Sequence, residues 1–152
     1  MPKANTKKTV SVPSKRLLIV VTIIGLILVW VGISQKTKCP FMLDNQCVVL
    51  ESVATPELRA QGLSGREHLA DHAGMLFVFD AAGRQCMWMR DMKFSLDIIW
   101  LTEDKRITKI EQNISPETYP QSFCGDDAKY VIEINTKTAE SAGLQIGQKL
   151  NF

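Results

Sequence analysis

The sequence predicts a mostly β (α+β) domain preceded by one transmembrane helix. Its 152 residues leave room for one domain and an anchor. An uncharged apolar run lies near the N-terminus, and short runs rich in β-branched residues, separated by turn residues, follow it. Most connections between these runs are too short for crossover helices, which favours antiparallel pairing. We therefore expect a compact antiparallel β-sandwich or a partly open barrel with two short helices.

Residues 17–34 are the expected transmembrane anchor. The stretch 17–33 contains no charged residue, and as a helix it would be roughly 25 Å long, near the lower limit for crossing a bilayer core. Five of the 18 Lys and Arg lie in the tail at 1–16; the other 13 and all 16 Asp and Glu follow the anchor, so that part carries a net charge of −3. The positive-inside rule places the tail in the cytoplasm and exports the rest.

A cleaved signal peptide is the main alternative to this signal anchor. The apolar core of a signal peptide is usually about 7–15 residues long and is followed by an A-x-A-like cleavage site. Here the run is longer and no such site is evident. Both interpretations export the domain, so we expect a single-pass protein of the cell inner membrane with its C-terminal domain in the periplasm or outside the cell. No basic stripe remains on that domain, so we expect no nucleic-acid partner.

All four cysteines follow the anchor, the first two in or at the end of a juxtamembrane link at 35–47. An even number of cysteines in an exported domain suggests two disulfides, with three pairings open. Cys39 and Cys47 would close a short loop, which would leave Cys86 and Cys124 to join two distant segments. Buried free thiols are the alternative. The C-x-x-C spacing of a metal site is absent, so no metal site is expected from the cysteines.

The exported domain, 48–152, begins with a strand and a short helix. Residues 47–54 are rich in β-branched side chains and predict a strand. Thr55 is a suitable N-cap, Pro56 fits the first helical position, and Gly62 is a natural end for the helix.

The remainder of the domain alternates strands with turns. Apolar or alternating runs predict strands at 74–80, 86–90, 96–102, 106–114, 128–135 and 148–152. Turns are expected at 81–84 and 103–105. A second short helix is expected at about 136–142 and is ended by Gly143.

Several stretches of this domain occur in an order typical of one family. They are ATPELRAQGLSGRE (54–67), GMLFVFD (74–80), WMRDMKFSLDIIW (88–100), Tyr119-Pro120 and AKYVIEIN (128–135). With them, residues 48–152 resemble the bacterial and archaeal family called domain of unknown function family 192. The resemblance implies a compact, mostly β fold whose members are often exported, and it implies no defined activity.

The family's polar and aromatic positions correspond to Arg66, Trp88, Asp97, Tyr119 and Glu133. These residues are the candidate ligand pocket, with Trp88 as an aromatic floor for a small ligand. The alternative is structural: Asp97 opens an apolar strand and needs a partner, for which Arg66 is available, and Trp88 belongs to the core. The structural interpretation is preferred, because buried charges are usually paired for stability.

The sequence offers two candidate metal sites, and neither is the preferred interpretation. Met87 and Met89 share one face of a strand and are thioether ligands suited to Cu(I), but Met often fills cores. His68 and His72 are spaced for a helical Zn²⁺ site, yet the Glu of H-E-x-x-H is missing. We expect no bound cofactor and an exposed pair of histidines.

No complete catalytic set can be assembled from the sequence, and we name no catalytic residue. The preferred function is therefore a membrane-tethered binding or interaction module with an unknown envelope protein or small ligand as its partner. An enzyme is the alternative: a hydrolase acting on an envelope polymer, with Asp97 and Glu133 as paired carboxylates. A Cu(I)-binding protein is a minor third possibility.

Overall fold

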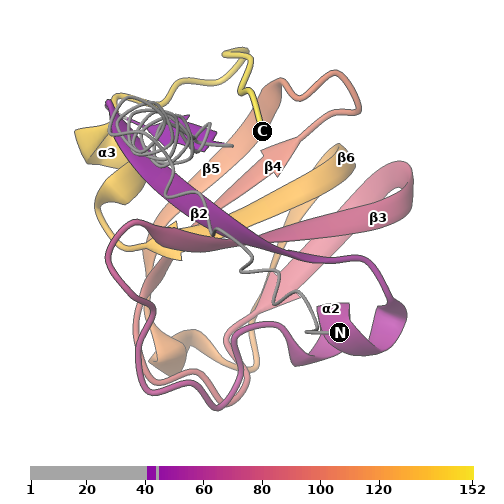
Figure 1. Cartoon of the computed structure of the whole chain (residues 1–152). Coiled ribbons are helices and arrows are strands. Elements are labelled where there is room, and N and C mark those ends of the chain that lie inside the picture. The colour runs from indigo at the N-terminus through magenta and orange to yellow at the C-terminus, as the bar shows by residue number, and fades with distance from the viewer. Residues whose placement is uncertain (1–40, 44) are drawn as a thin grey trace, which may run out of the picture. The chain divides into compact units, whose positions relative to one another are not determined.

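A computed structural model describes residues 41–43 and 45–152 (Figure 1). The expected tail, the anchor at 17–34 and Cys39 lie outside the described residues. Within the described part of the chain, no helix is long and apolar enough to cross a membrane.

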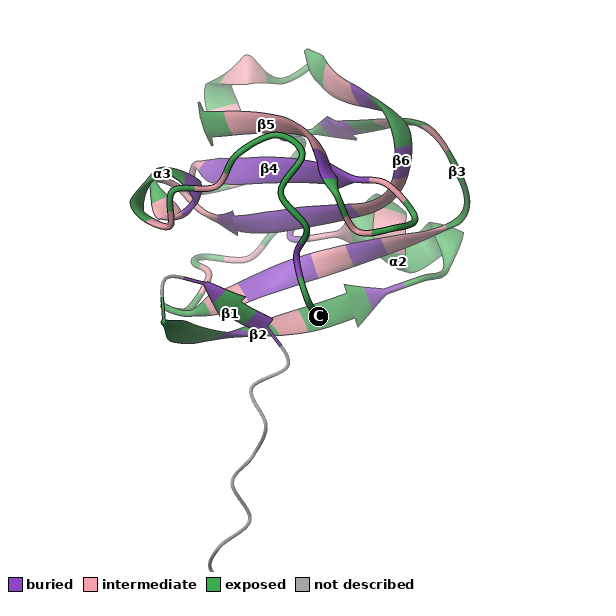
Figure 2. Cartoon of the chain, turned by 90° about the horizontal axis from the view of Figure 1, so that it is seen from above, coloured by how far each residue is buried: buried purple, intermediate pink, exposed green. Residues whose placement is uncertain are grey.

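Six strands form one sheet in the order β1-β2-β3-β6-β4-β5. The strands are β1 (Phe41–Leu43), β2 (Gln46–Val53), β3 (Ala73–Trp88), β4 (Leu96–Leu101), β5 (Ile107–Ile114) and β6 (Ser122–Asn135). The sheet curls into a half-barrel (Figures 1 and 2). A partly open barrel therefore describes the domain, and the expected alternative of two packed sheets is wrong.

Two short helices accompany the sheet, as expected. They are α2 (Pro56–Gln61) and α3 (Thr138–Ser141), and a 3₁₀ turn, η1 (Pro116–Thr118), precedes β6. Thr55 caps α2 by accepting a hydrogen bond from the Leu58 amide at 3.3 Å, and Gly62 ends the helix with φ of 50°. Both confirm the helix boundaries predicted from the sequence.

The connection through α2 makes one strand pair parallel. β2 and β3 run parallel, with Glu51 opposite Met75 and Val53 opposite Phe77, whereas the other pairs in the sheet are antiparallel. The segment between these strands is long enough for a crossover and carries α2, which is the usual requirement for parallel neighbours.

Several strand boundaries differ from the sequence prediction. β3 runs through the expected turn at 81–84, because register shifts between Val78 and Gln85 absorb the Gly and Ala residues without ending the pairing. β6 begins earlier, and β1 lies in the expected link. The predicted final strand at 148–152 is reduced to an isolated bridge between Arg106 and Lys149.

The sheet buries a separate apolar cluster on each face. Register places Met75, Ile98 and Glu133 on one face, and Ile134 and Asp97 on the other, because neighbouring residues of a strand point to opposite sides. The first face carries the cluster built around Val53, Leu63, Met75, Phe77, Met87, Met89, Leu96, Ile98, Trp100 and Val131. The second carries the cluster built around Phe41, Val48, Ile99, Leu101, Ile107, Ile132, Ile134 and Ala139.

The cysteines past residue 80 join β3 to β6. Cys86 and Cys124 are direct partners across the two antiparallel strands and form a disulfide. This confirms one of the two bonds expected. Cys47 is also disulfide-bonded, and Cys39, its expected partner, lies outside the described residues.

Candidate functional site

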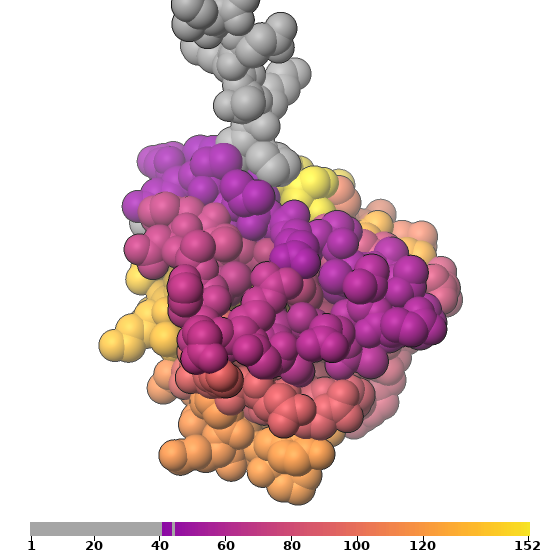
Figure 3. Space-filling model, turned by 60° about the horizontal axis from the view of Figure 1, so that its bottom comes forward, coloured from indigo at the N-terminus to yellow at the C-terminus, as the bar shows by residue number. Residues whose placement is uncertain are grey.

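A pocket of about 240 Å³ opens between α2 and the first face of the sheet. Its walls come from α2 and the loop after it, from both halves of β3, and from the loop that follows β3. The lining residues are Pro56, Arg59, Ala60, Gln61, Gly62, Leu63, Ser64, Phe77, Phe79, Cys86, Met87, Trp88, Met92 and Glu133. Figure 3 shows this side of the molecule, on which α2 and the loop after it contribute purple and magenta surface next to the surface of later residues.

Arg59 fixes the helical wall of this pocket against β3. Its guanidinium donates hydrogen bonds to the carbonyl oxygens of Ala54 and, at 2.9 Å, Val78. It also lies over the Phe79 ring at 5.0 Å and 3.8 Å from the Asp80 carboxylate. Both hydrogen bonds come from Nη1, and together with the ring and carboxylate contacts they hold Arg59 in the pocket wall.

The rim consists of two loops tied to each other. The Gly65 amide donates to the Asp91 carbonyl at 2.9 Å, and the Ser64 hydroxyl donates to the Arg90 carbonyl at 2.8 Å. Trp88 stands at this rim with 40% of its surface exposed, and the Arg90 guanidinium lies 5.4 Å from its ring. A large aromatic side chain is thus held at the pocket entrance by a backbone that is well anchored.

Glu133 is the one acidic side chain among the described residues that lines this pocket. It lies near the C-terminal end of β6, between Met75 of β3 and Ile98 of β4, and is only 4% exposed. No hydrogen bond or ion pair within the described part of the chain involves its carboxyl group. Burial without a compensating partner raises the pKa of Glu133 from 4.5 to about 8. At neutral pH the group is therefore largely protonated.

Asp97 is also buried, but it lies on the opposite face of the sheet, and both of its carboxylate oxygens accept hydrogen bonds. Its Oδ1 accepts a hydrogen bond from the Asn113 amide at 2.9 Å, and its Oδ2 accepts one from the Ala139 amide at 2.9 Å. The carboxylate thus joins β5 to the start of α3. This is a structural role, and Asp97 does not line the Glu133 pocket.

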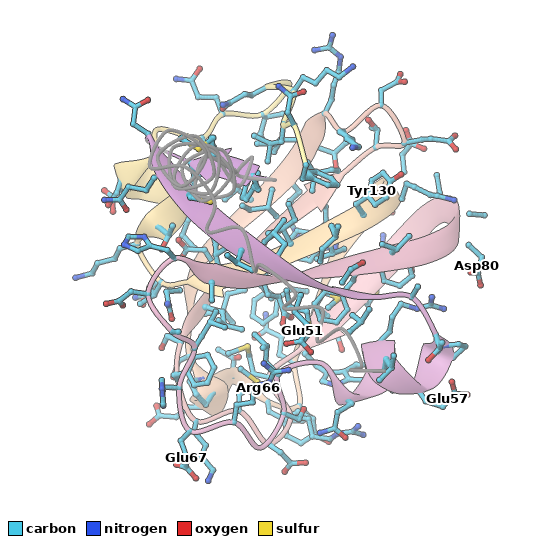
Figure 4. The ribbon with its side chains drawn as sticks, viewed as in Figure 1. Glu51, Glu57, Arg66, Glu67, Asp80 and Tyr130 are labelled. Carbon is cyan, nitrogen blue, oxygen red and sulfur yellow. A yellow bond between two sulfur atoms is a disulfide. The ribbon has the colours of Figure 1, made fainter. Side chains whose placement is uncertain are left out.

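The expected ion pair between Arg66 and Asp97 is wrong. Arg66 pairs with Glu51 of β2, with 2.8 Å between Nη2 and Oε2, and Figure 4 shows the two side chains meeting. Asp97 does not need a cation because backbone amides satisfy both of its oxygens. The sequence contains no signal for such partners, since every residue except proline carries an amide.

The expected pairing of Asp97 and Glu133 as two catalytic carboxylates also fails. Asp97 is opposite Ile134 across β4 and β6, whereas Glu133 is opposite Ile98. The two acids therefore project from opposite faces of the sheet and cannot act on one bond together.

Of the predicted pocket residues, the structure brings only Trp88 and Glu133 together around the pocket. Tyr119 follows η1 and is 49% exposed, outside the lining. Sequence reasoning missed Arg59, Phe77 and the neighbouring apolar walls. Arg59 does lie in the stretch 54–67 that carries the family resemblance, which was the available signal.

The metal hypotheses have no further support in the geometry. Met87 and Met89 are both buried in the first apolar cluster, and Met87 also lines the pocket; Cu(I) binding stays a prediction. His68 and His72 are exposed, as expected. Among the described residues, no group of three or more His, Cys, Asp or Glu is arranged to hold a metal ion.

Comparison with known proteins places the domain in an uncharacterised group. The model of a family described as "Uncharacterized ACR", the domain of unknown function family 192, matches residues 41–152. No curated protein matches the chain.

Two crystal structures are similar to it. One is a Sinorhizobium meliloti protein described as a candidate transcription regulator, 30% identical over 67% of this chain and 79% of that one, with a TM-score of 0.64. The other is a Novosphingobium aromaticivorans protein of unknown function, also 30% identical, over 68% and 74% of the two chains, with a TM-score of 0.63.

Proposed function

Since this chain belongs to the domain of unknown function family 192, for which no activity is defined, we propose a function from its own site. The protein is a membrane-tethered, extracytoplasmic binding module whose ligand occupies the Glu133 pocket. The observation that carries this proposal is the buried carboxyl of Glu133, which lines a pocket and has no partner among the described residues.

Among the described residues no fully buried side-chain oxygen lacks a hydrogen-bond partner, so the Glu133 carboxyl, which accepts none, keeps access to the pocket. Ionising a carboxyl group in such a desolvated site is costly unless a cation or a hydrogen-bond donor reaches it. A strongly raised pKa in a cleft is a common mark of a functional group. The apolar and aromatic walls around a single polar group are typical of a site for a small ligand.

The tether is supported by the sequence. The family match begins at residue 41, soon after the uncharged stretch at 17–33 and the basic tail before it. The link between anchor and domain would span at most about 25 Å when extended. The binding site would consequently work close to the outer surface of the membrane that carries the anchor.

Site-specific photo-crosslinking in native membranes tests the binding role. A photoreactive residue replaces Ala60, which lines the pocket, and in a matched control it replaces Ala82, an exposed residue of β3 outside the lining. We expect a defined adduct, identified by mass spectrometry, at position 60 and not at position 82. Equal labelling at the two positions would contradict a ligand site in this pocket.

The tether has its own test. We expect the full chain to stay with membranes after alkaline carbonate washing, and its C-terminal domain to be digested by protease added to spheroplasts. Release into the wash, or digestion only in inverted vesicles, would overturn the proposed anchor or its direction.

A further inference from the structure

We propose that the Glu133 pocket binds a small organic cation, with the ammonium group against the Glu133 carboxylate and its alkyl substituents on Phe77, Phe79 and Trp88. This inference rests on the proposed binding function and deepens it by naming the class of ligand.

Three acids lie in one row across the sheet, and only the middle one lacks a cation among the described residues. Register aligns Glu51 of β2, Met75, Glu133, Ile98 and Glu111 of β5 on the same face. The two outer acids each have a cation of the protein, and Glu133, between them, has none among the described residues. Glu51 pairs with Arg66 at 2.8 Å, and Glu111 pairs with Lys109 at 2.9 Å. A cation supplied by a ligand would complete the same pattern.

The described polar groups around Glu133 direct the hydrogen bonds they make to other acceptors. The Gln61 amide group donates to the Ser64 carbonyl at 3.1 Å, and the Ser64 hydroxyl donates to Arg90. Arg59, the charged side chain of α2 in the pocket wall, donates from Nη1 to Ala54 and Val78, and its Nη2 lies 3.8 Å from Asp80. Asp97 of β4 faces the other way. An occupant that supplies a positive charge or a hydrogen-bond donor would therefore complement Glu133.

The apolar walls suit an organic cation better than a hydrated inorganic one. Phe77, Phe79 and Trp88 supply aromatic surfaces, and Met87 and Met92 supply polarisable thioethers. Two of these rings already attract cations, since Arg59 lies over Phe79 at 5.0 Å and Arg90 over Trp88 at 5.4 Å. Aromatic surfaces of this kind recognise quaternary and alkylated ammonium groups.

Binding of a cation must be linked to a proton. Without a bound cation, Glu133 is largely protonated at neutral pH, because burial raises its pKa to about 8. A bound cation stabilises the ionised carboxylate, so binding releases the proton and becomes tighter as pH rises. The gain should be large from pH 6 to pH 8 and level off above pH 9.

The test uses the full chain in detergent micelles with two probes of the same shape. Choline carries a permanent positive charge, and 3,3-dimethylbutan-1-ol replaces its nitrogen by carbon. Dissociation constants are measured by calorimetry at pH 6, 7.5 and 9. We expect choline to bind at least about tenfold more tightly than the alcohol at pH 9, and its affinity to rise by roughly 30- to 100-fold from pH 6 to pH 9.

Variants assign these effects to the pocket. Glu133→Gln should remove the pH dependence and reduce the preference for choline to the part that the aromatic walls supply. Glu111→Gln, the matched control in the same row, should leave both unchanged. Trp88→Leu alters only the exposed rim, so it should weaken choline several-fold and keep the pH dependence, which provides a second measurement if Glu133→Gln folds poorly.

Three results would overturn the inference: equal binding of the two probes, choline affinity that is independent of pH or falls as pH rises, or no binding of choline. Equal binding of both probes would still support a ligand site. The absence of any adduct specific to position 60 would count instead against the binding function itself.

Discussion

Asp97 and Glu133 are neighbours in the sheet and are both buried, but they differ in the hydrogen bonds that their carboxyl groups accept. Asp97 is fully enclosed and receives two backbone hydrogen bonds of 2.9 Å. Glu133 is almost as enclosed and receives none from the described residues, and its pKa rises to about 8. The same fold thus satisfies the carboxylate of Asp97 with backbone amides and leaves the carboxyl of Glu133 without a partner among the described residues.

This difference shows that burial alone does not distinguish a structural acid from a functional one. The distinction comes from counting the donors that reach each oxygen. Asp97 connects β5 and α3, so it is expected to matter for folding. Glu133 joins no two elements and faces a pocket, so its replacement by a neutral residue should raise the unfolding free energy and remove the ligand site.

The pH dependence of stability gives the largest expected contrast. The folded-state pKa of Glu133 is above the unfolded value of 4.5, so between these values the folded protein binds the extra proton and stability falls as pH rises. As the pH rises from 4.5 to above 8, the unfolding free energy of the Glu133→Gln variant should therefore increase relative to that of the native chain, by up to about 5 kcal/mol.

Urea denaturation followed by near-ultraviolet circular dichroism, without ligand, measures this difference at several pH values. Glu111→Gln serves as the control, because that acid is paired with Lys109 outside the pocket. A gap between Glu133→Gln and the native chain that stays constant from pH 5 to pH 9 would mean that Glu133 is not an unpartnered buried acid.

Replacing Asp97 should have the next largest effect, in the opposite direction. Asp97→Ala leaves the amides of Asn113 and Ala139 buried or partly buried without their acceptor. We expect a loss of about 3–4 kcal/mol in the unfolding free energy, with a smaller loss for Asp97→Asn, which keeps one acceptor oxygen. A loss below about 1 kcal/mol, within the range of ordinary surface substitutions, would remove the structural assignment.

The Arg66–Glu51 pair should give the smallest effect. Both side chains are substantially exposed, so a double-mutant cycle with Arg66→Ala and Glu51→Ala should show a coupling of about 0.2–1 kcal/mol. A second cycle between Arg66 and Asp97 should show no coupling. Strong coupling in the second cycle would instead support the Arg66–Asp97 ion pair that the sequence suggested.

The elements that depend on local chemistry were predictable from the sequence. The cap at Thr55 and the end at Gly62 give α2 its boundaries, and the β-branched run at 128–135 lies in β6. The continuity of β3 was not predictable, because the residues at 81–84 form a turn in most contexts and here are held by pairing with β6. The parallel pairing of β2 with β3 depends equally on contacts made far along the chain.

The site divides in the same way. Trp88 and Glu133 were among the candidate pocket residues because they match the polar and aromatic positions of the family that the chain resembles. The partner of Asp97 was not identifiable, because backbone amides at 113 and 139 leave no pattern in the side chains. The helical wall with Arg59 follows only from the crossover that lays α2 against β3.

The most direct test of the account is the pKa of Glu133 in the full chain without ligand. Carbon-13 labelling of glutamate carboxyl groups, with Glu133→Gln to assign the signal, allows its titration to be followed by nuclear magnetic resonance. We predict a pKa of about 8 for Glu133. A pKa close to 4.5, the ordinary value for the group, would show that Glu133 already has a partner or contacts water, and would contradict the proposed site.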